Sequence, residues 1–288
     1  MTELKLVIMA AGMGSRFGSL KQMEGLGPSN EFLMDYAIYD AYQAGVRDIC
    51  LVVRESFLTA IRDRMTSVWK AYSDLKFEFV CQEVSDLPEG YKVPAERAKP
   101  WGTAHVLYVL RKQIKSPFLI INADDFYGRA GIQTMVNFLK QNPQKNALVG
   151  YPLKNTLSPH GPVTRGVCDI KNNQLVGIDE VEKIFFDDPR QVLASMNLWG
   201  FTPSIFSLIE KSFDTFLDKN IENPKAEYQI PQIINDLLKS QKIEVTALST
   251  DSEWFGVTYK EDKEAVQGKL NALIEKRVYP KSLFARPN

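Results

Sequence analysis

The 288-residue sequence has few of the residues that mark several large classes of protein. It contains only three cysteines, Cys50, Cys81 and Cys168, and they lie far apart. A disulfide framework or a cysteine-based metal site normally shows more cysteines at close, regular spacing. We therefore expect three buried thiols in a reducing compartment. The chain also has only two histidines, His105 and His160, and we assign neither of them a required catalytic role.

Net charge and long hydrophobic runs are also missing. Lys+Arg and Asp+Glu each number 35, so the surface offers no basic field for non-specific binding of nucleic acid, and we expect no nucleic-acid partner. The apolar stretch near the start, Leu6–Ala11, is too short for a signal-peptide core or a membrane span. We therefore expect a cytoplasmic protein without a membrane partner.

Short apolar runs alternate with longer segments of helical period through the first half of the chain. This alternation predicts βαβ units and a largely parallel sheet. The expected strands are Leu4–Met9, Asp48–Val53, Phe77–Cys81, Phe118–Asn122 and Ala147–Tyr151, and the expected helices are Glu31–Ala44, Phe57–Tyr72, Gly102–Ile114 and Gly131–Gln141.

The pattern changes after Pro152. Gly166–Ile170 and Leu175–Val181 flank a polar stretch of four residues, which predicts a β-hairpin. Two more strands are expected at Ser195–Phe201 and Ile243–Leu248, and helices at Pro203–Leu217, Tyr228–Lys239 and Lys260–Arg277. We predict a single domain over residues 1–288, made of an N-terminal half (1–152), an inserted substrate lobe (153–259) and a C-terminal helix (260–288).

The first expected strand breaks into a turn of small residues, Ala10-Ala11-Gly12-Met13-Gly14-Ser15-Arg16. In open α/β sheets ligands bind beyond the carboxyl ends of the strands, where the backbone amides of such a turn can point at phosphate oxygens. Both the Rossmann fingerprint and the P-loop would need a glycine where Phe17 stands, so neither motif is present. Arg16 offers a planar fork for phosphate oxygens and Lys21 a compact charge.

Two adjacent carboxylates, Asp124 and Asp125, directly follow the expected strand Phe118–Asn122, at the same edge of the sheet as the glycine turn. Magnesium prefers a few carboxylates together with phosphate oxygens, so Asp124 is a candidate ligand of an Mg²⁺ that bridges protein and triphosphate. Asp125 is a second candidate, with a helix N-cap or a turn as the alternative role. A phosphate monoester is largely dianionic at neutral pH, so the nucleophile of such a reaction needs no general base.

These motifs resemble the signature of the sugar-phosphate nucleotidyltransferase (nucleoside-diphosphate-sugar pyrophosphorylase) family, and the resemblance continues in order along nearly the whole chain. It implies a Rossmann-like three-layer α/β/α nucleotidyltransferase fold with a mostly parallel mixed sheet. It also implies Mg²⁺ as cofactor and an NTP and a sugar 1-phosphate as partners, which react to an NDP-sugar and pyrophosphate.

The resemblance also assigns site residues. The catalytic residues that it implies are Arg16, Lys21 and Asp124. The nucleotide-binding residues are Ala11, Gly12, Gly14, Ser15, Gln82, Gly102 and Thr103, and the sugar-phosphate-binding residues are Gly166, Glu182, Lys183 and Asn197. One position departs from the family: where its second metal-binding aspartate is expected, in a tryptophan-containing segment near the end, this chain has Gly256. The second metal ligand is therefore unassigned, with Asp251 and Asp262 as candidates.

Several alternatives stay open at this point. Adjacent aspartates at a strand end also suit the metal-diphosphate site of a glycosyltransferase that uses a nucleotide sugar. The missing second aspartate is compatible with a non-catalytic nucleotide-sugar sensor subunit. The amide of Gln82 can both donate and accept, which slightly favours UTP or dTTP without identifying the base. The acceptor, with phosphocholine included, and the oligomeric state, with a homo-oligomer included, are likewise undecided.

Overall fold

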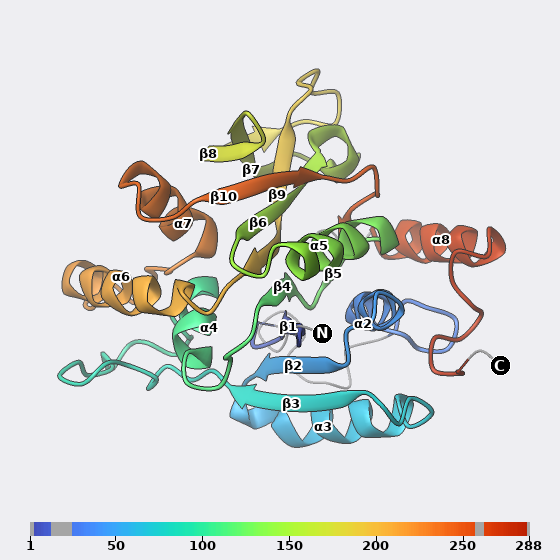
Figure 1. Cartoon of the computed structure of the whole chain (residues 1–288), viewed down its shortest axis with the longest axis horizontal. Helices are drawn as coiled ribbons and strands as arrows, with labels where there is room; N and C mark the ends of the chain where they lie inside the picture. The colour runs from blue at the N-terminus through green and yellow to red at the C-terminus, as the bar shows by residue number, and fades with distance from the viewer. Residues whose placement is uncertain (1–2, 13–24, 257–261, 287–288) are drawn as a thin grey trace.

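A computed structural model describes residues 3–12, 25–256 and 262–286 of the chain (Figure 1). The strands are β1 (Lys5–Met9), β2 (Asp48–Val53), β3 (Lys76–Cys81), β4 (Phe118–Asn122), β5 (Asp125–Phe126), β6 (Asn146–Pro152), β7 (Val163–Lys171), β8 (Gln174–Ile184), β9 (Leu193–Phe201), β10 (Val245–Ser249) and β11 (Phe255–Gly256). The helices are α2 (Leu33–Gln43), α3 (Glu55–Val68), α4 (Thr103–Leu110), α5 (Arg129–Gln141), α6 (Ile205–Asn220), α7 (Ile230–Lys239), α8 (Asp262–Glu275) and the short 3-10 helix η2 (Leu153–Thr156).

Nine of these strands form one sheet in the order β3-β2-β1-β4-β9-β6-β10-β8-β7, and β11 and β5 form a separate pair. Following the pairings through the described strands, only β8 and β9 run against the other members of the sheet. The mostly parallel, mixed sheet that the sequence predicts is thus confirmed. Strand β7 also pairs with β9, so the second half of the sheet curls back on itself.

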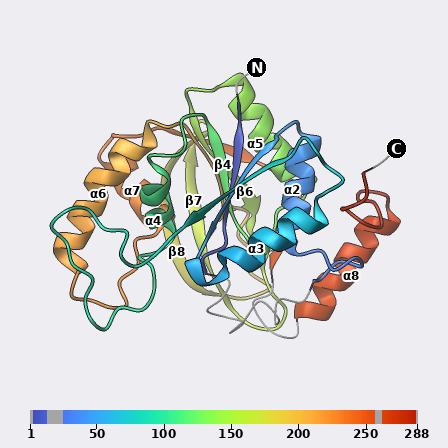
Figure 2. The same ribbon diagram turned by 90° about the horizontal axis from the view of Figure 1, so that it is seen from below.

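Helices cover both faces of the sheet, which gives the three-layer α/β/α arrangement (Figures 1 and 2). One buried cluster joins α2, α3, α5 and α8 to one face, and a second joins α4, α6 and α7 to the other. Alternate side chains of β1 pack into different clusters: Leu6 and Ile8 belong to the first, and Val7 and Met9 belong to the second. The central strands are apolar throughout because both of their faces are buried.

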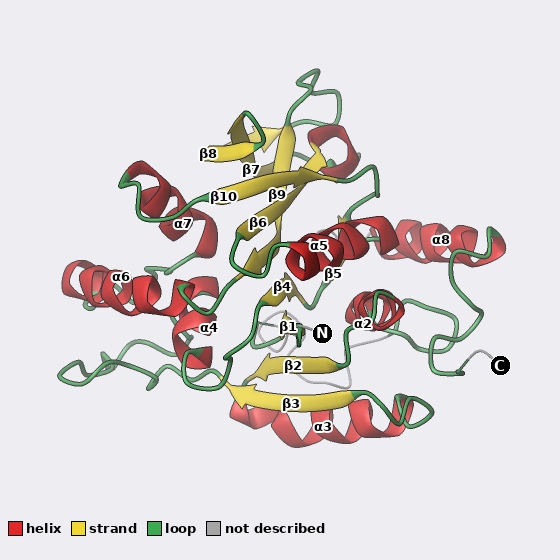
Figure 3. Cartoon of the chain, viewed as in Figure 1, coloured by secondary structure: helices red, strands yellow, loops and turns green. Residues whose placement is uncertain are grey.

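The expected elements are present, with shifts of a few residues at their ends (Figure 3). The predicted hairpin is longer than expected, and it turns through Asn172 and Asn173, whose φ angles of 52° and 61° are those of a two-residue type I′ turn. Helix α4 is shorter than its hydrophobic period suggested and ends at Leu110. The two-residue strands β5 and β11 were not predicted, because a segment of two residues carries no readable periodicity.

No helix in the described part of the chain is long and apolar enough to cross a membrane.

Candidate active site

The ends of β1 and β4 bring the first two sequence motifs together. The strands are parallel neighbours, with Met9 opposite Asn122, and the backbone N–H of Ala123 donates to the carbonyl of Met9 at 3.2 Å. Beyond this point the chain continues into Ala11 and Gly12 on one side and Asp124 on the other. These predicted residues therefore leave the same edge of the sheet side by side. Gly14, Ser15, Arg16 and Lys21 lie outside the described residues.

Asp125 is buried just beyond the end of β4, where its side chain is held by neighbours. Its Oδ2 accepts hydrogen bonds from Asn122 Nδ2 at 2.7 Å and from the hydroxyl of Tyr127 at 3.2 Å. Burial, together with the charge of the adjacent Asp124, raises the pKa of the Asp125 carboxyl well above its usual value. The pair is therefore a place where negative charge is costly unless a cation offsets it.

Gly256 stands where the resemblance leads us to expect a second metal-binding aspartate, and it lies next to Asp125. In the pair of β5 with β11, Gly256 lies directly opposite Asp125, and the ring of Phe255 stacks on that of Phe126 at 4.3 Å. A Cβ on Gly256 would lie 2.9 Å from Asp125 Oδ1 and 3.3 Å from the carbonyl of Asp124. The carboxylate of Asp125 thus occupies the space that a side chain at position 256 would need.

The donor set fits Mg²⁺ when part of its coordination comes from phosphate. No group of three or more His, Cys, Asp or Glu side chains that could hold a metal occurs among the described residues. Two carboxylates, Asp124 and Asp125, are what Mg²⁺ commonly takes from protein when a triphosphate supplies further oxygens. Of the other candidates, Asp251 is exposed, and Asp262 contacts Ser158 Oγ at 3.4 Å and His160 Nε2 at 3.9 Å.

Strand β9 changes partner at the edge of this site. Its C-terminal part pairs with β4 through Trp199 and Phe201, whereas its N-terminal part pairs with β7 through Ser195. Asn197 lies between the two pairings with a φ of 62°, a left-handed conformation that asparagine tolerates better than most residues. The strand order of the sheet reverses between β1 and β4, which is the kind of switch point where α/β sheets bind ligands, and the gap between β4 and β7 lies beside it.

A cavity of about 430 Å³ opens at the gap between β4 and β7. Its wall combines β7, β8 and β9 with the first turns of α7, and it reaches Asn122 at the end of β4. Most of its side chains are polar: the lining residues are Asn122, Thr164, Arg165, Gly166, Ile178, Asp179, Glu180, Ser195, Met196, Asn197, Gln229, Pro231, Gln232 and Asn235. The cavity therefore has the size and polarity of a site for a small polar ligand.

The predicted sugar-phosphate residues divide into two pairs. Gly166 and Asn197 line the cavity. Glu182 and Lys183 do not line it, and both are exposed further along β8, where the β7–β8 register shifts and Lys183 has a φ of 56°. On β8 the cavity is instead lined by Ile178, Asp179 and Glu180.

Gln82 is buried beside α4, and both hydrogens of its amide are used inside the protein. Nε2 contacts the carbonyl of Gly102 at 3.0 Å and His105 Nδ1 at 3.0 Å. His105 Nε2 lies 2.7 Å from the carbonyl of Asp86, which can only accept, so the ring proton is on Nε2 and Nδ1 accepts from Gln82. Burial lowers the pKa of His105 to about 4, which keeps the ring neutral. The side-chain oxygen of Gln82 is the part that remains for a ligand.

Gly102 and Thr103 join this segment to α7. Gly102 has a φ of 117°, and a Cβ there would lie 2.5 Å from the carbonyl of Tyr228. The hydroxyl of Thr103 accepts the backbone N–H of Ile230 at 3.0 Å. The predicted nucleotide-binding segment is thereby attached to the helix that forms one wall of the cavity.

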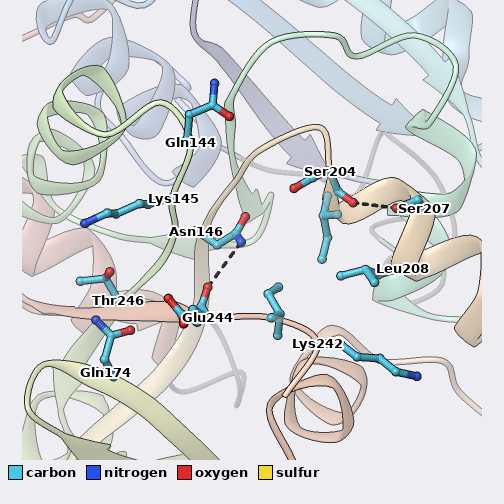
Figure 4. Close-up of a pocket in the computed structure, with 12 residues that line it drawn as sticks. Gln144, Lys145, Asn146, Gln174, Ser204, Ser207, Leu208, Lys242, Glu244 and Thr246 are labelled. Atoms are coloured by element: carbon cyan, nitrogen blue, oxygen red, sulfur yellow. Dashed lines mark hydrogen bonds between the residues drawn. The ribbon is translucent and has the colours of Figure 1, made fainter. Parts of the chain in front are cut away.

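A second cavity, of about 410 Å³, lies near the amino-terminal ends of β6 and β10 and the start of α6 (Figure 4). Lys145, Lys242, Ser204 and Ser207 are among its lining residues, and Asn146 Nδ2 donates there to the carbonyl of Glu244 at 3.4 Å. None of the predicted site residues lines it. We therefore place the candidate site at the carboxyl ends of β1 and β4.

The sequence did not single out Arg165, Ser195, Gln229, Gln232 or Asn235 as lining residues. Arg165 lies on β7, just before the predicted strand segment, and Ser195 lies on β9. Gln229 directly precedes α7, and Gln232 and Asn235 lie on that helix. None of these residues belongs to a short motif. The one usable signal is the alternation of side chains along β9, which places Ser195 on the same side as Asn197.

Comparisons with known proteins support the fold. A scan against protein-family models and a search of curated protein sequences each found no match. Among solved structures, a Bacillus anthracis protein assigned as a glucose-1-phosphate thymidylyltransferase, in complex with a sucrose, superimposes with a TM-score of 0.63 at 15% identity and covers 93% of this chain and 95% of its own.

Two further structures give the same picture. The inositol-1-phosphate CTP transferase from T. maritima has a TM-score of 0.60 at 12% identity, with 93% of this chain and 96% of that chain covered. A UDP-glucose pyrophosphorylase complexed with UDP-glucose has a TM-score of 0.59 at 20% identity, with 96% and 100% covered. At these identities the likeness concerns the fold alone, and this chain has the α/β fold shared by these nucleotidyltransferases.

Proposed function

We propose that this protein is a nucleotidyltransferase that joins a nucleoside monophosphate from an NTP to a sugar 1-phosphate and releases pyrophosphate. The observation that carries the proposal is the position of the polar cavity. It lies beside the β1/β4 switch point of the sheet and includes Asn122, the last residue of β4, which precedes Asp124 and Asp125 by two and three residues. A polar acceptor in this cavity would lie next to the edge where the glycine turn begins.

The chain's own residues have distinct tasks in this proposal. Arg16 and Lys21 offset the negative charge of the triphosphate, since an anionic phosphate oxygen has to approach an anionic α-phosphate. Asp124 and Asp125 would hold Mg²⁺, which when bound neutralises phosphate charge during the in-line displacement. Gly166 and Asn197 would orient the sugar so that its phosphate faces the α-phosphate. Glu182 and Lys183 remain candidates for binding the sugar phosphate.

The environment of Gln82 is compatible with UTP or dTTP as the nucleotide. Because Gly102 and His105 take both amide hydrogens, the Gln82 side chain offers a carbonyl oxygen to the base. The N3–H group of uracil or thymine can donate to such an oxygen, whereas N3 of cytosine has no hydrogen. The amino groups of cytosine, adenine and guanine can donate to the same oxygen, so the base has to be decided by measurement with different NTPs.

The test is pyrophosphate release with Mg²⁺, measured for UTP, dTTP, CTP, GTP and ATP against pooled sugar 1-phosphates and phosphocholine. Release that requires one NTP and a sugar 1-phosphate is the expected result, and Lys21→Ala should lower it by more than roughly a hundredfold without loss of fold. Release of a nucleoside diphosphate from a nucleotide sugar would instead support a glycosyltransferase. Nucleotide binding without any turnover would support a sensor subunit.

A further inference from the structure

Two asparagines in the cavity have their amide oxygens held by donors inside the protein. Asn235 Oδ1 accepts the backbone N–H of Ile178 at 3.1 Å, and Asn197 Oδ1 accepts the indole N–H of Trp199 at 3.2 Å. Both partners can only donate, so they determine which way each amide faces. The NH₂ group of each asparagine is therefore the part left for a ligand, and it is a hydrogen-bond donor.

In two other side-chain amides of the cavity wall, the NH₂ group and not the oxygen is bonded inside the protein. Asn122 Nδ2 donates to Asp125 Oδ2 at 2.7 Å, and Gln229 Nε2 donates to Glu227 Oε2 at 2.7 Å. The carboxylates accept these bonds, so the amide oxygens of Asn122 and Gln229 are left for a ligand as acceptors. The wall of the cavity thus combines oriented donors with oriented acceptors.

Ser195 adds a buried hydroxyl to this wall. Only 8% of the residue is exposed, and its Oγ has no hydrogen-bond partner among the described residues. A buried hydroxyl without a partner is destabilising, so its position calls for a physical reason. A Cβ on Gly166 would lie 3.0 Å from Ile178 Cγ2 and 3.6 Å from Ser195 Cβ, so the glycine keeps space open beside the hydroxyl.

We propose that Ser195 and Asn235 determine acceptor specificity by hydrogen bonding to ring hydroxyls of a sugar 1-phosphate, in a wall that also carries the charged side chains of Arg165, Asp179 and Glu180. This inference rests on the proposed function and narrows its substrate. Each sugar hydroxyl donates one hydrogen bond and accepts others, which matches a wall that offers both kinds of partner. The quaternary ammonium of choline neither donates nor accepts hydrogen bonds, so it cannot use the Asn235 amide or the Ser195 hydroxyl, and no aromatic side chain lines the described cavity for a cation–π contact.

The test uses an isosteric change of one amide and a matched control. Asn235→Asp keeps the shape of the side chain and the bond from Ile178 N–H, but it replaces the NH₂ donor with a carboxylate oxygen. Asn146→Asp is the control, because Asn146 Oδ1 also accepts a backbone N–H, that of Thr202 at 3.0 Å, at the opposite edge of the sheet. Ser195→Ala is the second test variant, and thermal unfolding checks that all variants fold.

Binding of glucose 1-phosphate and phosphocholine is measured by calorimetry, in parallel with pyrophosphate release. We expect Asn235→Asp to weaken glucose 1-phosphate binding about tenfold and Ser195→Ala about fivefold, with NTP affinity unchanged and the control within about twofold. Wild-type affinity in Asn235→Asp, no binding of glucose 1-phosphate to the wild type, or tighter binding of phosphocholine would overturn the inference. Binding with the expected pattern but without pyrophosphate release would contradict the proposed function and leave the sugar site standing.

Discussion

Asp40 on α2 and Asp125 on β5 are both buried aspartates whose pKa is raised mainly by loss of hydration, but their surroundings differ. Asp40 accepts a hydrogen bond from the hydroxyl of Tyr279 at 2.6 Å and pairs with Arg129 Nε at 3.2 Å. Asp125 has the carboxyl of Asp124 as its neighbour. The chain thus supplies a hydrogen-bonded cation to Asp40 within the fold, whereas at the edge of the candidate site it places two carboxylates together, and the charge of Arg165 offsets the raised pKa of Asp125 only in part.

This difference teaches how to separate a structural carboxylate from a functional one. A buried acid tied to its own cation joins elements of the fold, and Asp40 joins α2, α5 and the segment after α8. Adjacent acids at a sheet edge are costly for the protein alone and become favourable when a cation and phosphate are bound. Substitutions in the two regions should therefore affect different properties.

The largest effect is expected for Asp124→Asn. Loss of one carboxylate removes a proposed Mg²⁺ ligand, so turnover should fall by roughly a thousandfold, with unfolding temperature nearly unchanged. Steady-state pyrophosphate release and calorimetric binding of Mn²⁺ in the presence of NTP measure the two consequences. Asp40→Asn is the control and should keep turnover within about threefold. Equal losses in both variants would erase the distinction between the two regions.

Asp40→Asn should change the pH dependence of stability. The pKa of Asp40 is raised from 3.8 to about 7 in the folded protein. Between these values the native state keeps a proton that the unfolded chain has lost, so the contribution of Asp40 to the unfolding free energy falls as pH rises through this window. Denaturation in urea at pH 5 and pH 8 should show a fall in the wild type that exceeds the fall in Asp40→Asn by a few kcal/mol. Parallel pH profiles would contradict this assignment.

Gly256→Asp tests whether the Asp125 region has room for a third carboxylate. The new Cβ would lie 2.9 Å from Asp125 Oδ1, so we expect turnover about tenfold lower and an unfolding free energy lower by roughly 1–3 kcal/mol. The double variant Asp125→Ala/Gly256→Asp should regain part of the stability, because it moves the carboxylate instead of adding one. A fully stable, active single variant would show that the two positions do not compete.

The smallest effect is expected for Tyr279→Phe. The variant removes one hydrogen bond to Asp40 and leaves the carboxyl with Arg129, which should lower the unfolding free energy by about 1–2 kcal/mol. The KM values for NTP and sugar phosphate should stay at their wild-type levels, as kinetics at saturating and limiting substrate would show. A selective rise in one KM would connect this region to the site after all.

The parts of the fold and site that could be predicted are those that depend on neighbours in sequence. Phe118–Asn122 is apolar and short, so it predicts a buried strand, and the position of Asp124 at its end follows at once. The turn after β1 is recognisable from its small residues, although its arginine and lysine lie outside the described part. Local pattern was enough for the βαβ units and the largely parallel sheet, whereas the three-layer arrangement came from the resemblance to the nucleotidyltransferase family.

Tertiary structure decided the rest, because the contacts involved join residues far apart in the chain. Asn235 is an ordinary helical asparagine in the sequence, and only the N–H of Ile178 turns its NH₂ group into the donor of a cavity. Gly256 departs from the family pattern, but only its pairing with Asp125 explains which carboxylate fills that space. The sequence determines which residues could bind phosphate, metal and sugar, whereas the orientation of each polar group depends on the partner that the fold brings to it.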